Sequence, residues 1–344
     1  MLDRADVLRT PESRFRDLAR LGYPFAPHYL EIDGVRVHYV DEGPRDASET
    51  ILCLHGEPAW SFLYRKMIPT LVQAGYRVVA PDFVGFGRSD KLAHMRDYSH
   101  GLHTRTLTTL VNALDLESMT MVVQDWGGTT GLSVAEELEK RISRLVIMNA
   151  GLPPHGELRD LKVINKVKFA RNVMGLLGWK VVNRALGQFL PVGKVFLASC
   201  PGISKEAVAG YDAPFPDHRY KAGVAWWPKM VPLTQAGEVA AATRRAKVFL
   251  SGWTRPTFVL FSTECPVSGS LYDYFQALIP GVSHYPPELI LGAGHFLQED
   301  AGHEISEKIV GFVQSTQLGL STLGSSNEKV EPCPSRVESS SVES

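Results

Sequence analysis

The sequence of 344 residues has little net charge, few cysteines and no long apolar run, and each shortage excludes a class of protein. Its 36 basic and 37 acidic residues give a formal charge of −1, so the overall balance indicates neither a nucleic-acid partner nor a membrane partner. The four cysteines (Cys53, Cys200, Cys265 and Cys333) are too scattered to indicate a disulfide framework or a zinc site. No stretch is long enough to span a membrane, and the N-terminus lacks the apolar core of a signal peptide. We therefore expect a cytoplasmic protein.

Segments typical of buried strands alternate with segments of helical spacing along most of the chain. The expected strands are 29–32, 35–40, 51–54, 76–80, 118–123, 144–150, 257–262 and 288–291. The first two flank Asp33-Gly34, a dipeptide typical of a hairpin turn. Helical spacing is found at 62–74, 98–114, 129–141 and about 301–314. This alternation predicts an α/β protein with a mostly parallel, doubly wound sheet.

One internal stretch breaks the alternation. Residues 155–230, inserted after the sixth or so strand, lack strand signals and show helical spacing at 161–174, 176–186, 193–199 and 204–211. We interpret them as a helical cap over a core formed by residues 1–154 and 231–314. Residues 315–344 are rich in Ser, Glu, Pro and Thr, and we expect a disordered tail because they can bury little apolar surface.

The segment Val122–Gly128 has the pattern of a nucleophile elbow, in which a sharp turn between strand and helix exposes one side chain. The exposed side chain is the carboxylate of Asp125, which can attack an electrophilic carbon and form an ester. An Asp that merely caps the following helix is the alternative for this segment alone.

Two further loops follow expected strands, and the carboxyl ends of parallel strands meet at one edge of a sheet. They are His55–Pro58 and Gly294–Phe296. In this arrangement His295 would activate water as a general base, and the backbone N–H groups of Glu57 and Trp126 would form an oxyanion hole. The nucleophile precedes the histidine in the chain, as it does in α/β hydrolases.

Four segments together resemble the haloalkane dehalogenases of the α/β-hydrolase superfamily, and the resemblance covers about residues 15–314. They are His55-Gly56-Glu57-Pro58-Ala59-Trp60, Val123-Gln124-Asp125-Trp126-Gly127-Gly128, Ala293-Gly294-His295-Phe296-Leu297-Gln298-Glu299, and Ala213-Pro214-Phe215-Pro216-Asp217 with Tyr220-Lys221-Ala222-Gly223. Epoxide hydrolases share the elbow and oxyanion motifs, whereas Glu57 and the cap segment favour the dehalogenase branch.

The resemblance implies an α/β-hydrolase fold and the hydrolysis of a small apolar halogenated substrate to alcohol and halide. Asp125 would displace the halide, and no cofactor or metal would be needed. Indole N–H groups would bind the halide, because an indole donates a hydrogen bond and has no acceptor. Trp126 matches one such donor and Trp179 the second. Trp226 and Trp227 are the rival candidates, and we expect a monomer.

The position of the catalytic acid departs from the family pattern. The family has an Asp after the strand at 257–262, where this chain has Cys265. The related position used by other dehalogenases is Asn149. Glu264 is adjacent to Cys265 and is kept as an alternative acid, although neighbours on an extended segment point to opposite sides. We therefore expect reduced turnover.

Two other functions stay open at this point. An epoxide hydrolase would need cap tyrosines aimed at the epoxide oxygen, and Tyr211 and Tyr220 are the candidates. A non-catalytic α/β hydrolase that binds an apolar ligand would account for the substituted acid.

Overall fold

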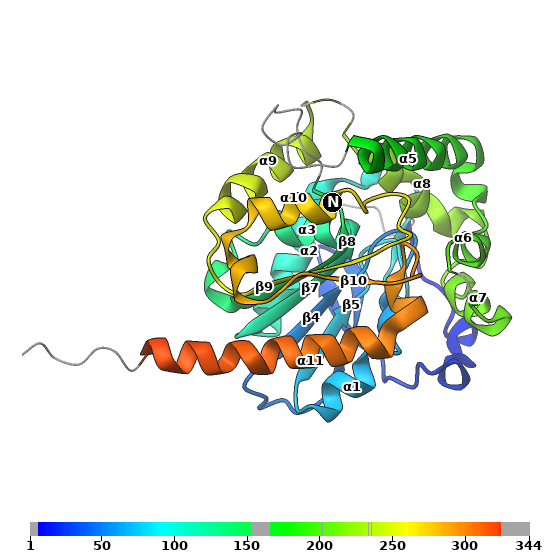
Figure 1. Cartoon of the computed structure of the whole chain (residues 1–344). Helices are drawn as coiled ribbons and strands as arrows, with labels where there is room; N and C mark the ends of the chain where they lie inside the picture. The colour runs from blue at the N-terminus through cyan, green and yellow to red at the C-terminus, as the bar shows by residue number, and fades with distance from the viewer. Residues whose placement is uncertain (1–5, 153–165, 201, 233, 235, 325–344) are drawn as a thin grey trace, which may run out of the picture.

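The structure, a computed structural model, describes residues 6–152, 166–200, 202–232, 234 and 236–324. Its main strands are β2 (His28–Ile32), β3 (Val35–Glu42), β4 (Thr50–Leu54), β5 (Arg77–Pro81), β7 (Met119–Asp125), β8 (Ile142–Ala150), β9 (Thr257–Ser262) and β10 (Glu288–Ile290). They form one sheet in the order β10-β9-β8-β7-β4-β5-β3-β2 (Figure 1). The strands from β10 to β5 are parallel to their neighbours, and β3 is antiparallel to both β5 and β2. The prediction of a mostly parallel sheet is confirmed.

Burial explains why the central strands are almost continuously apolar. Every residue of β4 and of β9 is buried, because helices cover both faces of the sheet. The hairpin between β2 and β3 turns at Asp33 and Gly34, which both have positive φ angles, as expected for this dipeptide. One small feature had not been predicted, namely the pairing of β1 (Val7–Leu8) with β6 (Lys91–Leu92). Two-residue strands leave no periodic signal.

The core helices lie on both faces of the sheet. They are α1 (Ile68–Gln73), α2 (His100–Ala113), α3 (Trp126–Ser133), α9 (Glu238–Ser251), α10 (Leu271–Leu278) and α11 (Leu297–Gly324). Two expected helices are shorter than predicted. The segment 62–74 contains a 3-10 turn at Ser61–Tyr64 before α1, and 129–141 contains only the end of α3 followed by turns and a 3-10 helix. Among these core helices, α9 and α10 had not been predicted, and neither had α8 (Ala222–Met230) of the inserted region.

The C-terminal helix corrects one boundary of the expected tail. Helix α11 bends at Ala301, whose backbone is not helical, and then continues to Gly324, about ten residues past the predicted end. Residues 315–324 are therefore helical and not disordered. The rest of the expected tail, 325–344, lies outside the described residues.

The cap consists of α5 (Lys166–Leu186), α6 (Val192–Ser199), α7 (Lys205–Asp212) and α8 (Ala222–Met230). Helix α5 lies above the carboxyl ends of the strands, and α6 and α7 descend along one side (Figure 1). We had expected two helices, 161–174 and 176–186, where α5 is one. Gly175 instead allows close packing, since a Cβ there would come 2.3 Å from the carbonyl oxygen of Pro266. Residues 161–165 of the first expected helix lie outside the described residues.

A buried ionic group joins the cap to the core. The guanidinium of Arg65 donates to both carboxylate oxygens of Glu299 at 2.7 and 2.8 Å, and the Tyr211 hydroxyl of α7 donates to Glu299 at 2.7 Å. Burial opposes the charge of Glu299, but the hydrogen bonds and charge of Arg65 lower the pKa of that carboxyl to about 2. The ionised Glu299 therefore fastens α7 to the start of α11.

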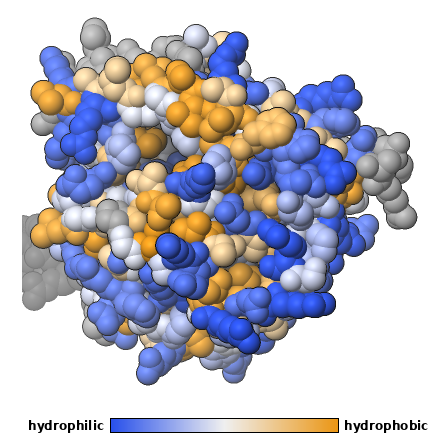
Figure 2. Space-filling view, turned by 90° about the vertical axis from the view of Figure 1, so that its right-hand side faces the viewer, coloured by the Kyte–Doolittle hydropathy of each residue, from blue (hydrophilic) through white to orange (hydrophobic). Residues whose placement is uncertain are grey.

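The outer surface on the cap side is mixed in character. Figure 2 shows hydrophobic residues gathered toward its top and hydrophilic residues over much of the rest. Within the described ranges no helix is both long and apolar enough to cross a membrane.

Candidate active site

Asp125 stands at a strained turn between β7 and α3. Its φ and ψ angles are 51° and −122°, a conformation that a non-glycine residue rarely adopts. The turn fits because the next residues are small. A Cβ at Gly127 would come 2.1 Å from the Leu54 carbonyl oxygen, and one at Gly128 would come 2.4 Å from the Cβ of Ala150. The Asp125 side chain makes no capping hydrogen bond to α3, so the capping alternative is not what the structure shows.

The carboxylate of Asp125 has a different neighbour at each oxygen. Oδ1 accepts a hydrogen bond of 2.8 Å from the backbone N–H of Glu57, in the loop after β4. Oδ2 lies 3.2 Å from Nε2 of His295, in the loop after β10. Gly56 permits this approach, since a Cβ there would come 2.3 Å from Oδ1. One oxygen is thus held by a backbone donor, and the other faces a titratable ring.

The second ring nitrogen of His295 faces a sulfur atom. Nδ1 lies 3.2 Å from Sγ of Cys265, in the loop after β9. The sulfur also accepts a hydrogen bond of 3.4 Å from the Ser268 N–H and lies 3.3 Å from the Ser268 hydroxyl. Asp125, His295 and Cys265 therefore form a linear series with the imidazole in the middle.

Electrostatics favour charge on both members of the His295–Cys265 pair. Burial alone would lower the pKa of His295, but Cys265 and Asp125 outweigh it and raise the pKa to about 10. Burial alone would raise the pKa of the Cys265 thiol, but the charge and hydrogen bond of His295 and the donors of Ser268 lower it. Both shifts favour an imidazolium beside a thiolate. A thiolate stabilises the positive charge of the imidazolium, whereas a neutral thiol carries no charge with which to do so.

Glu57 is a buried carboxyl whose surroundings favour its uncharged form. Its pKa is raised well above the usual range, first by burial and then by the charge of Asp125, although His295 and a hydrogen bond from Trp179 act the other way. Burial and the charge of Asp125 thus favour the neutral carboxylic acid form of Glu57. This arrangement keeps a second negative charge away from the nucleophile.

These side chains open into a cavity of about 360 Å³ beneath the cap. Much of its wall is aliphatic or aromatic, which suits an apolar ligand. The wall includes Trp126 and Thr129 of α3, Leu176, Trp179 and Val182 of α5, and Leu271 of α10. In the described parts of the chain, no cluster of three or more His, Cys, Asp or Glu residues could hold a metal ion.

Comparison with known proteins gives consistent results. A family model described as the α/β hydrolase fold matches residues 49–302. A haloalkane dehalogenase of Psychrobacter cryohalolentis is 40% identical over 312 residues, which is 89% of this chain and 98% of the relative. One of Mycolicibacterium paratuberculosis is 39% identical over 315 residues, 90% of this chain and 99% of the relative. The chain belongs to the haloalkane dehalogenase family.

Solved structures agree with this assignment. Haloalkane dehalogenase DpaA from Paraglaciecola agarilytica NO2, described as tetrameric, superposes with a TM-score of 0.78 at 35% identity. The match covers 88% of this chain and 97% of that one. The fold predicted from the sequence, an α/β hydrolase with a largely parallel sheet, is confirmed.

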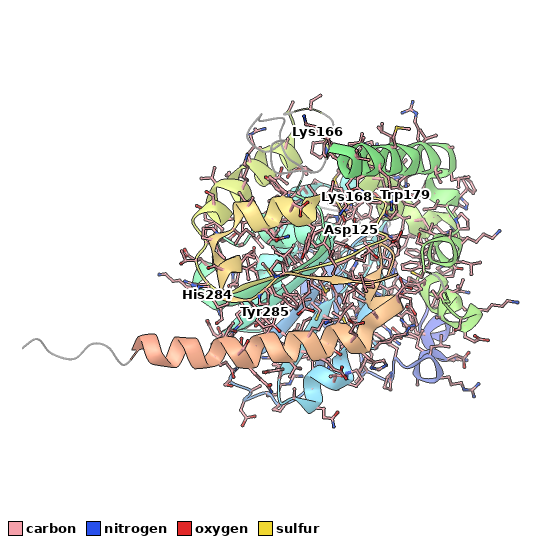
Figure 3. All side chains as sticks on the ribbon, viewed as in Figure 1. Asp125, Lys166, Lys168, Trp179, His284 and Tyr285 are labelled. Atoms are coloured by element: carbon pink, nitrogen blue, oxygen red, sulfur yellow. The ribbon has the colours of Figure 1, made fainter. Side chains whose placement is uncertain are left out.

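In a haloalkane dehalogenase the halide needs donors, and both predicted tryptophans reach the cavity. Trp126 begins α3 beside Asp125, and Trp179 projects from the cap helix (Figure 3). The rival candidates lie elsewhere. Trp227 donates its indole N–H to Nε2 of His103 at 2.5 Å and stacks on Trp126, and Trp226 lines a separate hollow on the cap.

The structure also decides among the three predicted acid positions. Glu264 is contradicted as the partner of His295, because its side chain is 61% exposed and lies 3.9 Å from Arg171 on α5. Its neighbour Cys265 is buried and lies 3.2 Å from the His295 ring, after a turn at Thr263 and Glu264 that follows β9. Asn149 donates to the carbonyl oxygens of Gly294 and His295 at 3.1 and 3.0 Å, so it holds the backbone of the histidine loop and not the ring.

The tyrosines expected of an epoxide hydrolase do not line the cavity. Tyr211 is buried against Glu299, and Tyr220 is absent from the cavity wall.

Two contributors had not been predicted. Ser268 donates to the sulfur, and the side-chain amide of Gln124 donates to the His295 carbonyl oxygen at 3.2 Å. Gln124 directly precedes the nucleophile, which is the one signal that could have identified it.

Proposed function

We propose that the protein hydrolyses carbon–halogen bonds of small apolar haloalkanes through an alkyl ester on Asp125, giving an alcohol and a halide ion. The observation that carries this proposal is a carboxylate at the elbow, in an apolar cavity, with a backbone donor on one oxygen and His295 at the other. Membership of the haloalkane dehalogenase family supports it.

In the first step Oδ2 of Asp125 attacks the carbon that carries the halogen, a C–O bond forms, and the halogen leaves with the bonding electron pair. The cavity walls exclude water, so the leaving halide depends on protein donors. The indole N–H groups of Trp126 and Trp179 supply hydrogen bonds to the anion. Since indoles carry no acceptor, both are committed to donation.

In the second step His295 takes a proton from water, and the resulting hydroxide adds to the ester carbonyl carbon. The negative charge that develops on Oδ1 meets the N–H of Glu57, with the N–H of Trp126 as the proposed second donor. Collapse breaks the bond between ester oxygen and acyl carbon, and the imidazolium returns its proton to the alcohol oxygen. Asp125 is left as a carboxylic acid that contains the oxygen of the water molecule, and it loses its proton through His295 to solvent, which restores the carboxylate. Esterification removes the negative charge of Asp125, one of the groups that raise the His295 pKa. A larger share of the ring is then neutral and able to accept a proton from water.

The proposal includes the organisation of the chain. We infer that 1–154 and 231–314 form the catalytic core and 155–230 the cap. The described cysteines Cys53, Cys200 and Cys265 are free, which supports a reducing compartment such as the cytoplasm. A monomer stays a prediction.

Halide release tests this function. The parent should release halide from bromoalkanes, and Asp125→Ala should release none while its circular dichroism stays unchanged. Halide release by the folded variant at the parental rate would exclude Asp125 as the nucleophile. A parent that binds bromoalkanes without releasing halide would favour the non-catalytic alternative.

A further inference from the structure

The outward face of cap helix α5 is apolar, which is unusual for a surface helix. Val167, Met174 and Val181 are spaced seven residues apart, lie on the same side of the helix, and are 80%, 69% and 67% exposed. Exposed small or apolar residues fill the rows between them: Ala170, Leu177, Gly178 and Ala185. A surface helix normally turns polar residues to solvent. Here the apolar stripe faces outward.

Positive charge is concentrated in the same part of the chain. Residues 166–205 contain no Asp or Glu and seven basic residues, namely Lys166, Lys168, Arg171, Lys180, Arg184, Lys194 and Lys205. The whole chain is close to neutral, so this excess is local. Helical spacing places Arg171 on one flank of the stripe and Arg184 and Lys166 on the other, all three exposed (Figure 3 shows Lys166 at the start of α5).

Two of these basic side chains have partners among the described residues. Arg171 lies 3.9 Å from Glu264, but both side chains are more than 60% exposed and their attraction is weak in water. Lys180 points inward and donates to the carbonyl oxygens of Pro228 and Val231, so it does not belong to the rim.

We propose that α5 lies flat on an anionic lipid surface, with the apolar stripe inserted at the boundary between head groups and acyl chains and the basic rim against lipid phosphates and carboxylates. An apolar face with lysine and arginine beside it is the pattern of helices that lie in a membrane interface. Anionic lipid attracts such basic residues individually, and the apolar side chains add area-dependent binding. The contact is peripheral, since in the described chain no helix can span a bilayer.

A second copy of the chain fits this face less well. Pairing α5 with itself would bring the basic rims of two molecules together, and neither helix carries an acidic residue to separate them. Like charges placed face to face oppose association. An anionic surface complements both the stripe and the rim.

The position of α5 also connects this surface with the cavity, a point that rests on the proposed function. Gly175, Leu176 and Trp179 on the inner side of the helix line the cavity, and Val182 lines it while being 43% exposed. Apolar haloalkanes concentrate in lipid. A cap helix lying on the membrane would place the cavity wall next to that reservoir.

Vesicle co-sedimentation of the full-length protein tests the proposal without requiring turnover, so its outcome is independent of the proposed function. The parent should pellet with vesicles of phosphatidylcholine mixed with phosphatidylserine, pellet poorly with phosphatidylcholine alone, and lose binding as salt rises. The double variant Met174→Ser/Val181→Ser should bind these vesicles at least about tenfold more weakly than the parent, because two exposed apolar side chains are lost. Neither residue lines the cavity.

Val248→Ser is the matched control, because Val248 is a 74% exposed apolar residue on α9, outside the cap. It should bind vesicles like the parent. The double variant Lys166→Gln/Arg184→Gln should lose the preference for phosphatidylserine. It tests the proposal independently if Met174→Ser/Val181→Ser folds poorly. Absence of binding to either vesicle, or undiminished binding by both double variants, would overturn the proposal. A dimer in sedimentation velocity that dissociates in the serine variant would assign the face to a second copy instead.

Discussion

The sulfur of Cys265 should matter for one step of the reaction and not for the other. During displacement of the halide, His295 transfers no proton, so its partner has little influence. During ester hydrolysis the ring becomes an imidazolium, and Asp125 is then an uncharged ester. Cys265 is then the neighbour of the ring that can still carry a negative charge, 3.2 Å from Nδ1.

The magnitude follows from the pKa of His295. Its rise from 6.5 to about 10 corresponds to about 5 kcal/mol in favour of the imidazolium, at about 1.4 kcal/mol for each pKa unit. Cys265 and Asp125 share this effect. If Cys265 accounts for about 2 kcal/mol, Cys265→Ser should slow ester hydrolysis about 30-fold, because serine keeps a hydrogen-bonding group but carries no charge. Cys265→Asp should hydrolyse the ester at least as fast as the parent.

Single-turnover experiments separate the two steps, with halide release reporting displacement and intact-protein mass reporting the ester. Cys265→Ser should show a near-normal burst of halide followed by a long-lived ester. Cys200→Ser is the matched control, since Cys200 is also buried and free but is not a partner of His295. Ester hydrolysis at the parental rate in Cys265→Ser would refute the role of the thiolate.

Two further predictions concern halide binding and the anchoring of the cap. Saturable quenching of tryptophan fluorescence by bromide should weaken in Trp179→Phe and stay unchanged in Trp226→Phe; equal quenching in the parent and Trp179→Phe would place the second donor elsewhere. Glu299→Gln should lower the free energy of unfolding by about 3 kcal/mol at pH 7, because the pKa of Glu299 falls from 4.5 to about 2 on folding. A lowered folded-state pKa stabilises above pH 4.5, and this contribution disappears as the pH falls toward 2. Urea unfolding at pH 7 and at pH 2 checks this prediction, and Glu206→Gln, a change at a fully exposed carboxylate, is the control. A loss of unfolding free energy at pH 2 equal to that at pH 7 would contradict it.

Much of the fold could be predicted because its signals are local. Buried parallel strands such as β4 and β9 are nearly continuous apolar runs, and Asp33-Gly34 specifies its own turn. The helix boundaries were less predictable. Two helices were expected on either side of Gly175, but α5 is continuous there, and the contact that requires a glycine is with Pro266, about ninety residues away in the chain. Sequence spacing cannot report such a contact.

The site was predictable to the extent that it follows strand ends. The loops after β4, β7 and β10 bring Glu57, Asp125 and His295 together as expected. The choice between Cys265 and Glu264 depended on how one loop turns, and the structure places Cys265 against His295 and Glu264 at the surface. The role of Cys265 as the partner in catalysis stays a prediction. The charge state of the pair could not be derived from sequence, because it depends on the distance to His295 and on donors from Ser268.

The covalent intermediate is the central claim, and trapping it is the most direct test. His295→Gln should still displace halide but should lack the base for hydrolysis, so mixing it with a bromoalkane should increase its mass by one alkyl group. Peptide mapping should place that group on Asp125, and Asp125→Asn/His295→Gln should gain no mass. A His295→Gln protein that releases halide with full turnover and no adduct, or that carries the alkyl group on another residue, would contradict the account.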